Sequence, residues 1–234
     1  MTSYKLSDAE GADNYYNPLL LWWYDFWVHW VSALFAWKCS SKNILLPFFL
    51  SNIGSRHCDV GVGTGYYLSA VRKRQPSWPQ DKLTLVDFHI RCLRKAANRV
   101  GIADRTECVL ANILEPIPIQ PERQFDSISL MYVLHCLPGA SKDKGRVFAN
   151  LKPLLKDSGT LFGSTLLCRG VRQNWFSWLL QRIYNAVDMF QNRADFPDDF
   201  VRALEEEFEE VESVIIGTVL MFKARKPRRY GVLQ

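Results

Sequence analysis

The stretch HCDVGVGTGYY, which begins at His57, contains residues whose types and spacing suit ligand binding. Three glycines occupy alternate positions: Gly61, Gly63 and Gly65. Glycine at this spacing lets the backbone turn sharply after a strand and leaves room for a ligand against the chain. Asp59, two positions before the first glycine, could accept a hydrogen bond from an ammonium group, directly or through water. We therefore expect a small-molecule site at this loop.

Two phosphate-binding interpretations of the loop are disfavoured by the residues that follow it. A P-loop needs Lys and then Ser or Thr after its last glycine, whereas Gly65 is followed by Tyr66 and Tyr67. The dinucleotide fingerprint needs its third glycine at position 66, where a tyrosine hinders the close helix approach that pyrophosphate requires. The interpretation that remains is an adenosine ligand without phosphates.

The pattern acid-x-Gly-x-Gly-x-Gly, from Asp59 to Gly65, resembles the first motif of the class I S-adenosylmethionine-dependent methyltransferases. Later segments resemble the family in order and spacing, over residues 55–167. The resemblance implies an α/β, Rossmann-like fold with a mostly parallel seven-stranded sheet, flanking helices and aromatic-rich helical lid segments. It also implies S-adenosylmethionine as the cofactor. The motif and the aromatic N-terminal segment further resemble a small-molecule subgroup of microbial natural-product pathways.

The resemblance implies further cofactor contacts at the ends of later strands. Asp87 would accept both ribose hydroxyls at the end of the second strand, with Phe88 beside it. Asn112, where the family more often has Asp, would offer its carbonyl oxygen to the adenine amino group, and Ile113 follows it. Met131 lies on the fourth strand, which lines the reaction side of the pocket in the family.

No motif fixes a general base, and four side chains are candidates for catalysis. Methyl transfer from a sulfonium is an in-line displacement, so alignment supplies much of the rate, and a base helps when the acceptor is a hydroxyl or a protonated amine. His135 follows the expected fourth strand and Tyr132 lies at its end; both could face the substrate, or could serve backbone bonding and core packing respectively. Asp25 and His29 lie one helical turn apart and could face the pocket, or form a surface pair. No metal site is expected, because the six cysteines lack metal-ligand spacing.

From residue 56 onward, strand and helix patterns alternate, which predicts a parallel sheet with helices on both faces. Strands are expected over 56–62, 82–88, 107–113, 125–134 and 159–167, with one or two more over 213–225. Helices are expected over Tyr66–Arg74, Ile90–Val100 and 144–155. The pair Pro197-Asp198 predicts a further helix start, with Asp198 as its N-cap.

The chain divides into five segments of one methyltransferase domain. They are an N-terminal helical lid (1–54), a cofactor-binding core (55–167), a helical insertion or substrate cap (168–200), a final helix and strands (201–225) and a basic tail (226–234). The aromatic run at 19–37 nears the length of a membrane span. Asp25, His29 and Ser32 interrupt it along one helical side, so we expect a lid and no stable membrane insertion.

The amino-acid composition limits the kinds of binding partner that we expect. The 234 residues are 48% apolar and 23% charged, as in ordinary globular proteins, and the net charge of +5 is modest. Much of that charge lies near the C-terminus, which is typical of a solvated end, so no nucleic-acid partner is expected. The absence of a secretory signal and the scattered cysteines predict a cytoplasmic protein. A homodimer is one use for an exposed aromatic surface.

Several functions remain open at this stage. The leading one is O- or N-methylation of a hydrophobic or aromatic small molecule in secondary metabolism, because eight tryptophans and other aromatics suit an apolar pocket. The main alternative is a non-methylating reaction on the same fold, such as a pericyclase-like cyclisation of a polyketide-type substrate. A nucleic-acid methyltransferase is disfavoured because the fourth strand lacks an Asn/Asp-Pro-Pro-Tyr-type stretch. A purely structural protein would have no need of the glycine loop.

Overall fold

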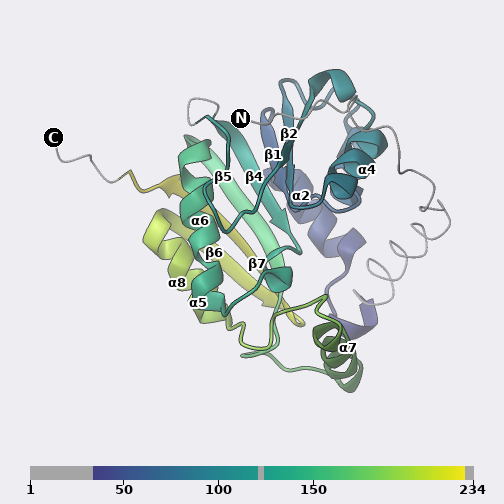
Figure 1. Ribbon diagram of the computed structural model, residues 1–234, viewed down its shortest axis with the longest axis vertical. Coiled ribbons are helices and arrows are strands. Elements are labelled where there is room, and N and C mark those ends of the chain that lie inside the picture. Colours follow the sequence, from purple (N-terminus) through teal and green to yellow (C-terminus); the bar gives the residue numbers. More distant parts are fainter. Residues whose placement is uncertain (1–33, 121–123, 230–234) are drawn as a thin grey trace.

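The structure is a computed structural model that describes residues 34–120 and 124–229. Its sheet contains β1 (His57–Val60), β2 (Leu83–Asp87), β3 (Thr106–Leu110), β4 (Phe125–Met131), β5 (Leu155–Leu166), β6 (Phe208–Ile216) and β7 (Val219–Pro227). The strand order is β3-β2-β1-β4-β5-β7-β6 (Figure 1). Strands β1 to β5 are parallel, whereas β7 runs antiparallel between β5 and β6. This confirms the predicted mostly parallel, seven-stranded sheet.

Helices cover both faces of the sheet. One face packs against α2 (Leu46–Asn52), α3 (Tyr66–Arg74) and α4 (Ile90–Val100), and the other against α5 (Ser141–Lys144), α6 (Arg146–Leu151) and α8 (Pro197–Glu207) (Figure 1). Short turns complete the path: η4 (Ser41–Leu45), η5 (Ala103–Arg105), η6 (Leu134–Cys136) and η7 (Lys152–Leu154). Within the ranges that the structure describes, no helix has the length and apolarity to cross a bilayer.

The parallel arrangement gathers the predicted binding residues at one edge of the sheet. Asp59 lies near the carboxyl end of β1, Asp87 ends β2 and Met131 ends β4. Parallel strands present their carboxyl ends at the same edge, where open α/β sheets bind ligands. Along β1, alternate side chains point to opposite faces, so Cys58 joins the core under α6 and α8 while Asp59 faces α3.

Three local predictions were wrong. The single helix expected over 144–155 is α5, α6 and η7, and β5 begins at Leu155 rather than at 159. At Gly145, between α5 and α6, an added Cβ would lie 2.5 Å from Ala203 Cβ of α8, so glycine permits this close contact. Helix α8 begins with Pro197 after Phe196 as N-cap, which places Asp198 in the first turn instead. Proline suits that first helical position because its missing N–H would lack a helical partner there anyway.

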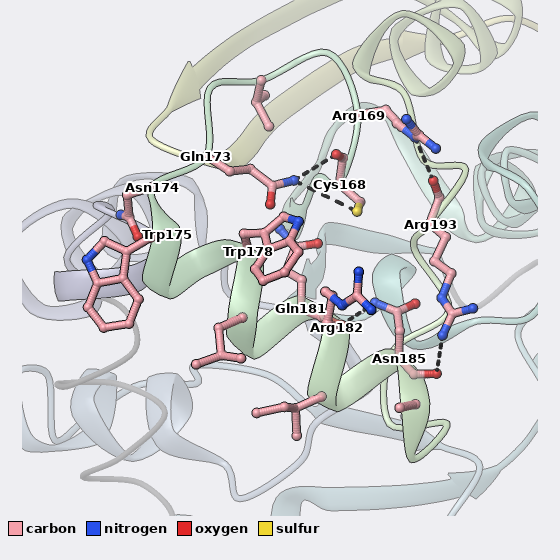
Figure 2. A pocket seen from close by; sticks show the side chains of 14 residues that line it. Cys168, Arg169, Gln173, Asn174, Trp175, Trp178, Gln181, Arg182, Asn185 and Arg193 are labelled. Carbon is pink, nitrogen blue, oxygen red and sulfur yellow. Dashed lines mark hydrogen bonds between the residues drawn. The ribbon is translucent and has the colours of Figure 1, made fainter.

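The chain between β5 and α8, residues 168–196, forms an insertion around α7 (Trp175–Ala186), beyond the carboxyl end of β5 (Figure 1). A hollow of about 1180 Å³ borders α7, and Trp175, Trp178 and Ile183 are exposed along it (Figure 2). Arg182 lies over the Trp178 ring, with 4.8 Å between the guanidinium carbon and the ring centroid. The hollow combines aromatic and aliphatic surface with guanidinium groups.

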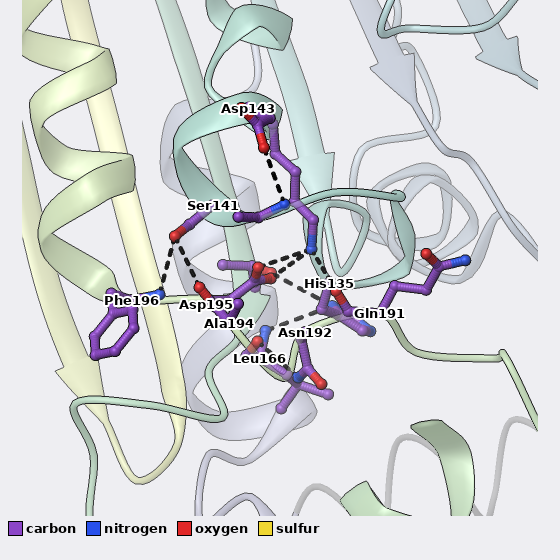
Figure 3. Close-up of polar contacts among 12 residues, drawn as sticks. His135, Ser141, Asp143, Leu166, Gln191, Asn192, Ala194, Asp195 and Phe196 are labelled. Carbon is purple, nitrogen blue, oxygen red and sulfur yellow. Dashed lines mark hydrogen bonds and ion pairs between the residues drawn. The ribbon is translucent and has the colours of Figure 1, made fainter. Parts of the chain in front are cut away.

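A buried ion pair fastens the insertion to helix α5 (Figure 3). Lys144 Nζ donates to both carboxylate oxygens of Asp195, at 2.8 and 2.7 Å, and to the Gln191 carbonyl at 2.9 Å. Both charged side chains are fully buried. The Gln191 N–H donates to the His135 carbonyl at 2.8 Å. The segment before α8 is therefore held between α5 and η6.

Amide side chains of α7 and of the segment that follows it bind the insertion to the end of β5. Asn192 Nδ2 donates to the Leu166 carbonyl at 3.1 Å, and Gln181 Nε2 donates to the Leu167 carbonyl at 3.0 Å. Asn185 Nδ2 donates to Asn192 Oδ1 at 2.8 Å, so the amides also bind one another. Buried polar groups are costly unless paired, and here the amides satisfy carbonyls where β5 ends.

Removing one partner of the ion pair should destabilise the whole fold. In Lys144→Met, the Asp195 carboxylate stays buried without its cation, so we expect the free energy of unfolding to fall by about 3–5 kcal/mol. Urea unfolding measures this loss. Lys144→Met combined with Asp195→Leu should recover much of it, because no unpaired charge remains.

The matched control is Lys156→Met, which breaks the half-exposed pair of Lys156 with Asp126. Its loss should stay below about 1 kcal/mol, as for other exposed ion pairs. Equal losses in the two lysine variants would contradict the assignment of Lys144 as the anchor of the insertion.

Candidate functional site

The glycine loop lies directly after β1, and each glycine is used differently. Gly61, Gly63 and Gly65 have φ angles of +69°, +52° and +69°, in the left-handed region that favours glycine. A Cβ on Gly61 would lie 2.3 Å from Val133 Cγ2, and one on Gly65 would lie 3.0 Å from Ala96 Cα. A Cβ on Gly63 would meet no atom within 4 Å. The outer glycines therefore permit close packing, while the middle one borders open space that a ligand could occupy.

Asp87 ties the loop to β2. Its Oδ2 accepts a long hydrogen bond from the Gly63 N–H at 3.4 Å, and its Oδ1 accepts from the His89 N–H at 2.8 Å. Burial raises the pKa of this carboxyl, and the backbone hydrogen bonds oppose that effect. Phe88 follows with its side chain 66% exposed, which is unusual for so large an apolar group. A buried acceptor and an exposed ring thus lie side by side next to the loop.

Asp59 is buried beneath the loop, only 6% exposed. Ser129 Oγ, from the neighbouring strand β4, donates a short hydrogen bond to Asp59 Oδ1. Burial raises the pKa of Asp59 to about 7, the negative charge of Asp87 adds to this, and the Ser129 hydrogen bond opposes it. Two carboxylates near one loop favour a cationic group between them, which would promote ionisation of Asp59.

The other predicted cofactor residues lie at the same edge but are already engaged. Asn112 Oδ1 accepts from the Leu114 N–H at 3.1 Å, which leaves one lone pair for a further donor. The Ile113 side chain is 6% exposed and packs in the core under α6, and the Met131 side chain is 7% exposed and packs on the α3 face. Ile113 and Met131 therefore help to shape this edge mainly through packing.

Tyr132 has an unusual backbone and an unsatisfied hydroxyl. Its φ is +59°, which is uncommon for a bulky residue and is found preferentially at functional sites. Its N–H donates to the Ser164 carbonyl at 2.8 Å, which fixes this conformation. The hydroxyl is buried and has no hydrogen-bond partner among the described residues, and burial keeps its pKa well above the ordinary value. It is therefore a neutral hydroxyl with a proton to donate.

His135 lies in η6, between β4 and the insertion. It is 3% exposed, its Nδ1 accepts a long hydrogen bond from the Leu166 N–H at 3.4 Å, and the Phe190 ring packs edge-on at 4.5 Å. Burial lowers its pKa to about 3, and the Lys144 charge adds to this. The imidazole is neutral at physiological pH and a weak base. The other two catalytic candidates, Asp25 and His29, lie outside the described residues.

Ser129 is a site residue that the sequence interpretation missed. The signal was present, because Ser127 and Ser129 alternate with apolar residues in FDSISLM, an otherwise buried strand. Only the pairing of β4 with β1 shows that Ser129 lies opposite Asp59. In the described parts of the chain, no three His, Cys, Asp or Glu side chains group as metal ligands would.

Comparison with known proteins agrees with this geometry. A family model described as "Methyltransferase domain" matches residues 58–161, from β1 into β5. The chain is 99% identical to "Methyltransferase ctvB" of Aspergillus terreus, over 98% of this chain and 100% of the relative. It is 42% identical to "Physcion biosynthesis cluster O-methyltransferase" of Aspergillus chevalieri, over 96% of this chain and 99% of the relative.

A solved structure shows the same fold at low sequence identity. It is described as "Structure analysis of Geranyl diphosphate methyltransferase in complex with SAM" and has a TM-score of 0.57 and 14% identity. The match covers 81% of this chain and 86% of that one. The extensive identity to curated methyltransferases, on a sheet of this order with a glycine loop after β1, shows that the chain belongs to the class I S-adenosylmethionine-dependent methyltransferases.

Proposed function

We propose that this protein transfers a methyl group from S-adenosylmethionine to an oxygen atom of a hydrophobic or aromatic metabolite. The observation that carries the proposal is the location of a glycine loop and an aromatic-rich insertion at the same edge of the sheet. Oxygen is favoured over nitrogen because a relative at 42% identity bears the name of an O-methyltransferase. That name also supports a role in secondary metabolism.

The residues at the loop fit each part of the cofactor. Asp59 would take the ammonium group and Asp87 the ribose hydroxyls, as buried acceptors suited to charged or polar donors. The open space beside Gly63 would let the ligand lie close to the backbone. The exposed Phe88 ring would pack against the adenine. The free lone pair of Asn112 would accept from the adenine amino group.

Ile113 and Met131 would contribute to the pocket in less direct ways. The Ile113 side chain is in the core, so only its backbone would contact the adenine. The Met131 side chain would form the wall of the pocket near the reacting methyl group. When bound, the cofactor supplies an activated methyl group. The chain's own task is to align the acceptor and exclude water.

The acceptor would lie between Tyr132 and the insertion. The Tyr132 hydroxyl is a buried donor at this edge without a partner among the described residues, so it would hydrogen-bond the acceptor and orient it. Neutral His135 would support that orientation and would not serve as a strong base. Asp25 and His29 stay candidates on the N-terminal segment. The exposed aromatic side chains of α7 favour an apolar acceptor.

The remaining predictions concern partners. Basic residues near the C-terminus are paired with carboxylates, as in Lys223 with Glu212 at 2.8 Å and Arg229 with Asp157 at 3.0 Å. This pairing supports the absence of a nucleic-acid partner, because fewer free cations remain for phosphates. A homodimer and a cytoplasmic location stay predictions. Relatives named as methyltransferases favour methyl transfer over the cyclisation alternative.

The function itself is tested by product mass. Purified protein, S-adenosylmethionine and a panel of phenolic and polyketide-type acceptors should yield a product heavier by one methylene unit, with S-adenosylhomocysteine in equal amount. A product of unchanged mass, formed only in the presence of the protein, would instead support the cyclisation alternative.

Loss of the Asp87 carboxylate should weaken cofactor binding. We expect Asp87→Ala to bind S-adenosylmethionine roughly tenfold to a hundredfold more weakly, the range for losing a hydrogen bond to a charged group. Calorimetric titration measures the dissociation constant, and thermal unfolding checks that the variant folds. Asp104→Ala is the control, because Asp104 is an exposed carboxylate in η5. Unchanged binding in the folded Asp87→Ala protein would exclude the ribose role.

The Tyr132 hydroxyl should matter for the acceptor and not for the fold. In Tyr132→Phe, we expect kcat/KM for the acceptor to fall about threefold to tenfold, the range for one neutral hydrogen bond. Binding of S-adenosylhomocysteine and the melting temperature should stay at wild-type levels or above, since an unsatisfied buried hydroxyl is removed. Undiminished kcat/KM would show that the hydroxyl does not touch the acceptor.

A further inference from the structure

A chain of buried polar side chains links β4 and β1 and ends at Asp59. His57 Nδ1 lies 2.7 Å from Ser127 Oγ, and His57 Nε2 lies 3.0 Å from Ser129 Oγ. Ser129 Oγ then donates to Asp59 Oδ1, while the Gly54 N–H donates to Ser127 Oγ at 2.7 Å. His57 and both serines are completely buried.

The carboxylate end of the chain fixes the direction of its hydrogen bonds. Ionised Asp59 can only accept, so Ser129 donates its single proton to Asp59 and must accept from His57 Nε2–H. Nδ1 of the neutral ring is then an acceptor, so Ser127 donates to it while accepting from the Gly54 N–H. This requires a neutral imidazole with its proton on Nε2, and burial lowers the pKa of His57 to about 3, which keeps it neutral.

The sheet register builds this chain. Ser127 is the partner of His57 across the β1–β4 pair, and Ser129 is the partner of Asp59. Alternate residues share one face, so all four side chains point to the same side, toward α2 and α3. Aromatic rings of Phe49 and Phe162 enclose the imidazole, with centroids 5.7 and 6.1 Å away. Apolar residues would fill this space without the cost of burying polar groups, so packing alone does not account for the chain.

We propose that Ser127, His57 and Ser129 are positioning residues that hold the Asp59 carboxylate in the orientation needed to bind the cofactor's ammonium group. The inference rests on the proposed function, in which Asp59 receives that ammonium. Ser129 occupies Oδ1, whereas Oδ2 makes no hydrogen bond within the described parts of the chain. Oδ2 is therefore the oxygen left for the ligand, and its direction is set by the fixed Oδ1.

The charged and titratable groups around Asp59 predict a pH dependence. Asp87 faces it from β2, neutral Tyr67 faces it from α3, and neutral His57 acts through the chain. Neutral Cys58 precedes it in β1 but points to the opposite face of the sheet. Because the pKa of Asp59 is about 7, its ionised fraction rises through neutral pH, and cofactor affinity should rise with it. The Ser129 hydrogen bond favours the ionised form, so losing it should move this transition to higher pH.

The experiment is calorimetric titration with S-adenosylhomocysteine between about pH 6 and about pH 8, in buffers of different ionisation enthalpy. Near pH 7, we expect Ser129→Ala to bind about tenfold more weakly than wild type, with its pH transition shifted upward and more protons released on binding. The affinity and pH transition of His57→Leu should shift in the same direction, because the Ser129 hydroxyl is then free to rotate. Those of Ser127→Ala should shift less.

Cys58→Ala is the matched control, because Cys58 is equally buried on β1 but points to the opposite face. It should keep the wild-type pH profile. Ser129→Thr retains the hydroxyl and should restore much of what Ser129→Ala loses. Thermal unfolding identifies variants that do not fold, and if His57→Leu is one of them, the two Ser129 variants decide.

The outcomes separate this inference from the proposed function. If folded Ser129→Ala binds with the wild-type affinity and pH profile, the chain does not position Asp59 and the inference is overturned. If the wild-type protein fails to bind S-adenosylhomocysteine at any pH, the proposed function fails first. Equal weakening in Ser129→Ala and Cys58→Ala would show a general packing effect, and would also overturn the inference.

Discussion

The turn between β1 and α3 is the constraint on which the site depends. Its left-handed positions allow the chain to reverse within a few residues and leave Gly63 bordering open space. The end of β4 and the flank of α4 both approach this turn so closely that a methyl group at Gly61 or Gly65 would displace them. The position of Val133, next to Tyr132, therefore depends on the absence of a β-carbon at Gly61, and the approach of α4 depends on its absence at Gly65.

Around this turn, polar groups are buried in two separate arrangements with different purposes. The chain through His57 lies on the face of the sheet that packs against α2 and α3, and it ends on a single carboxylate at the ligand edge. The amides and the ion pair of Lys144 lie beyond the end of β5 and hold the insertion. The His135 carbonyl accepts from the Gln191 N–H of the insertion, so the segment after β4 that carries Tyr132 also holds the insertion in place.

The sequence allowed much of the fold to be predicted, because its signals are local. The glycine motif, the helix Tyr66–Arg74 and the helix closed by Gly101 depend on neighbouring residues, and all three are found in the structure. The helix expected over 144–155 was wrong at both ends: the chain turns at Gly145, which contacts α8, and η7 with its proline leads directly into β5 at Leu155.

The site could be predicted only where it follows the chain in order. Asp59 and Asp87 end consecutive strands, so their approach follows from the alternation of strands and helices. The roles of Ser129 and His57 depend on the register of β1 against β4, two strands that are distant in sequence. The pairing register of two such strands leaves no periodic pattern in the sequence. In the sequence, a single buried serine cannot be distinguished from any other strand residue.

The way α7 is fastened has an evolutionary consequence. Gln181 of α7 and Asn192 after it bind main-chain carbonyls at the end of β5, and every amino acid provides such a carbonyl. The outward side chains, among them Trp175, Trp178 and Ile183, take no part in that attachment. Substitutions on the outer face can therefore accumulate without displacing the helix. Related proteins can in this way acquire specificity for different acceptors while the residues that bind the methyl donor stay unchanged.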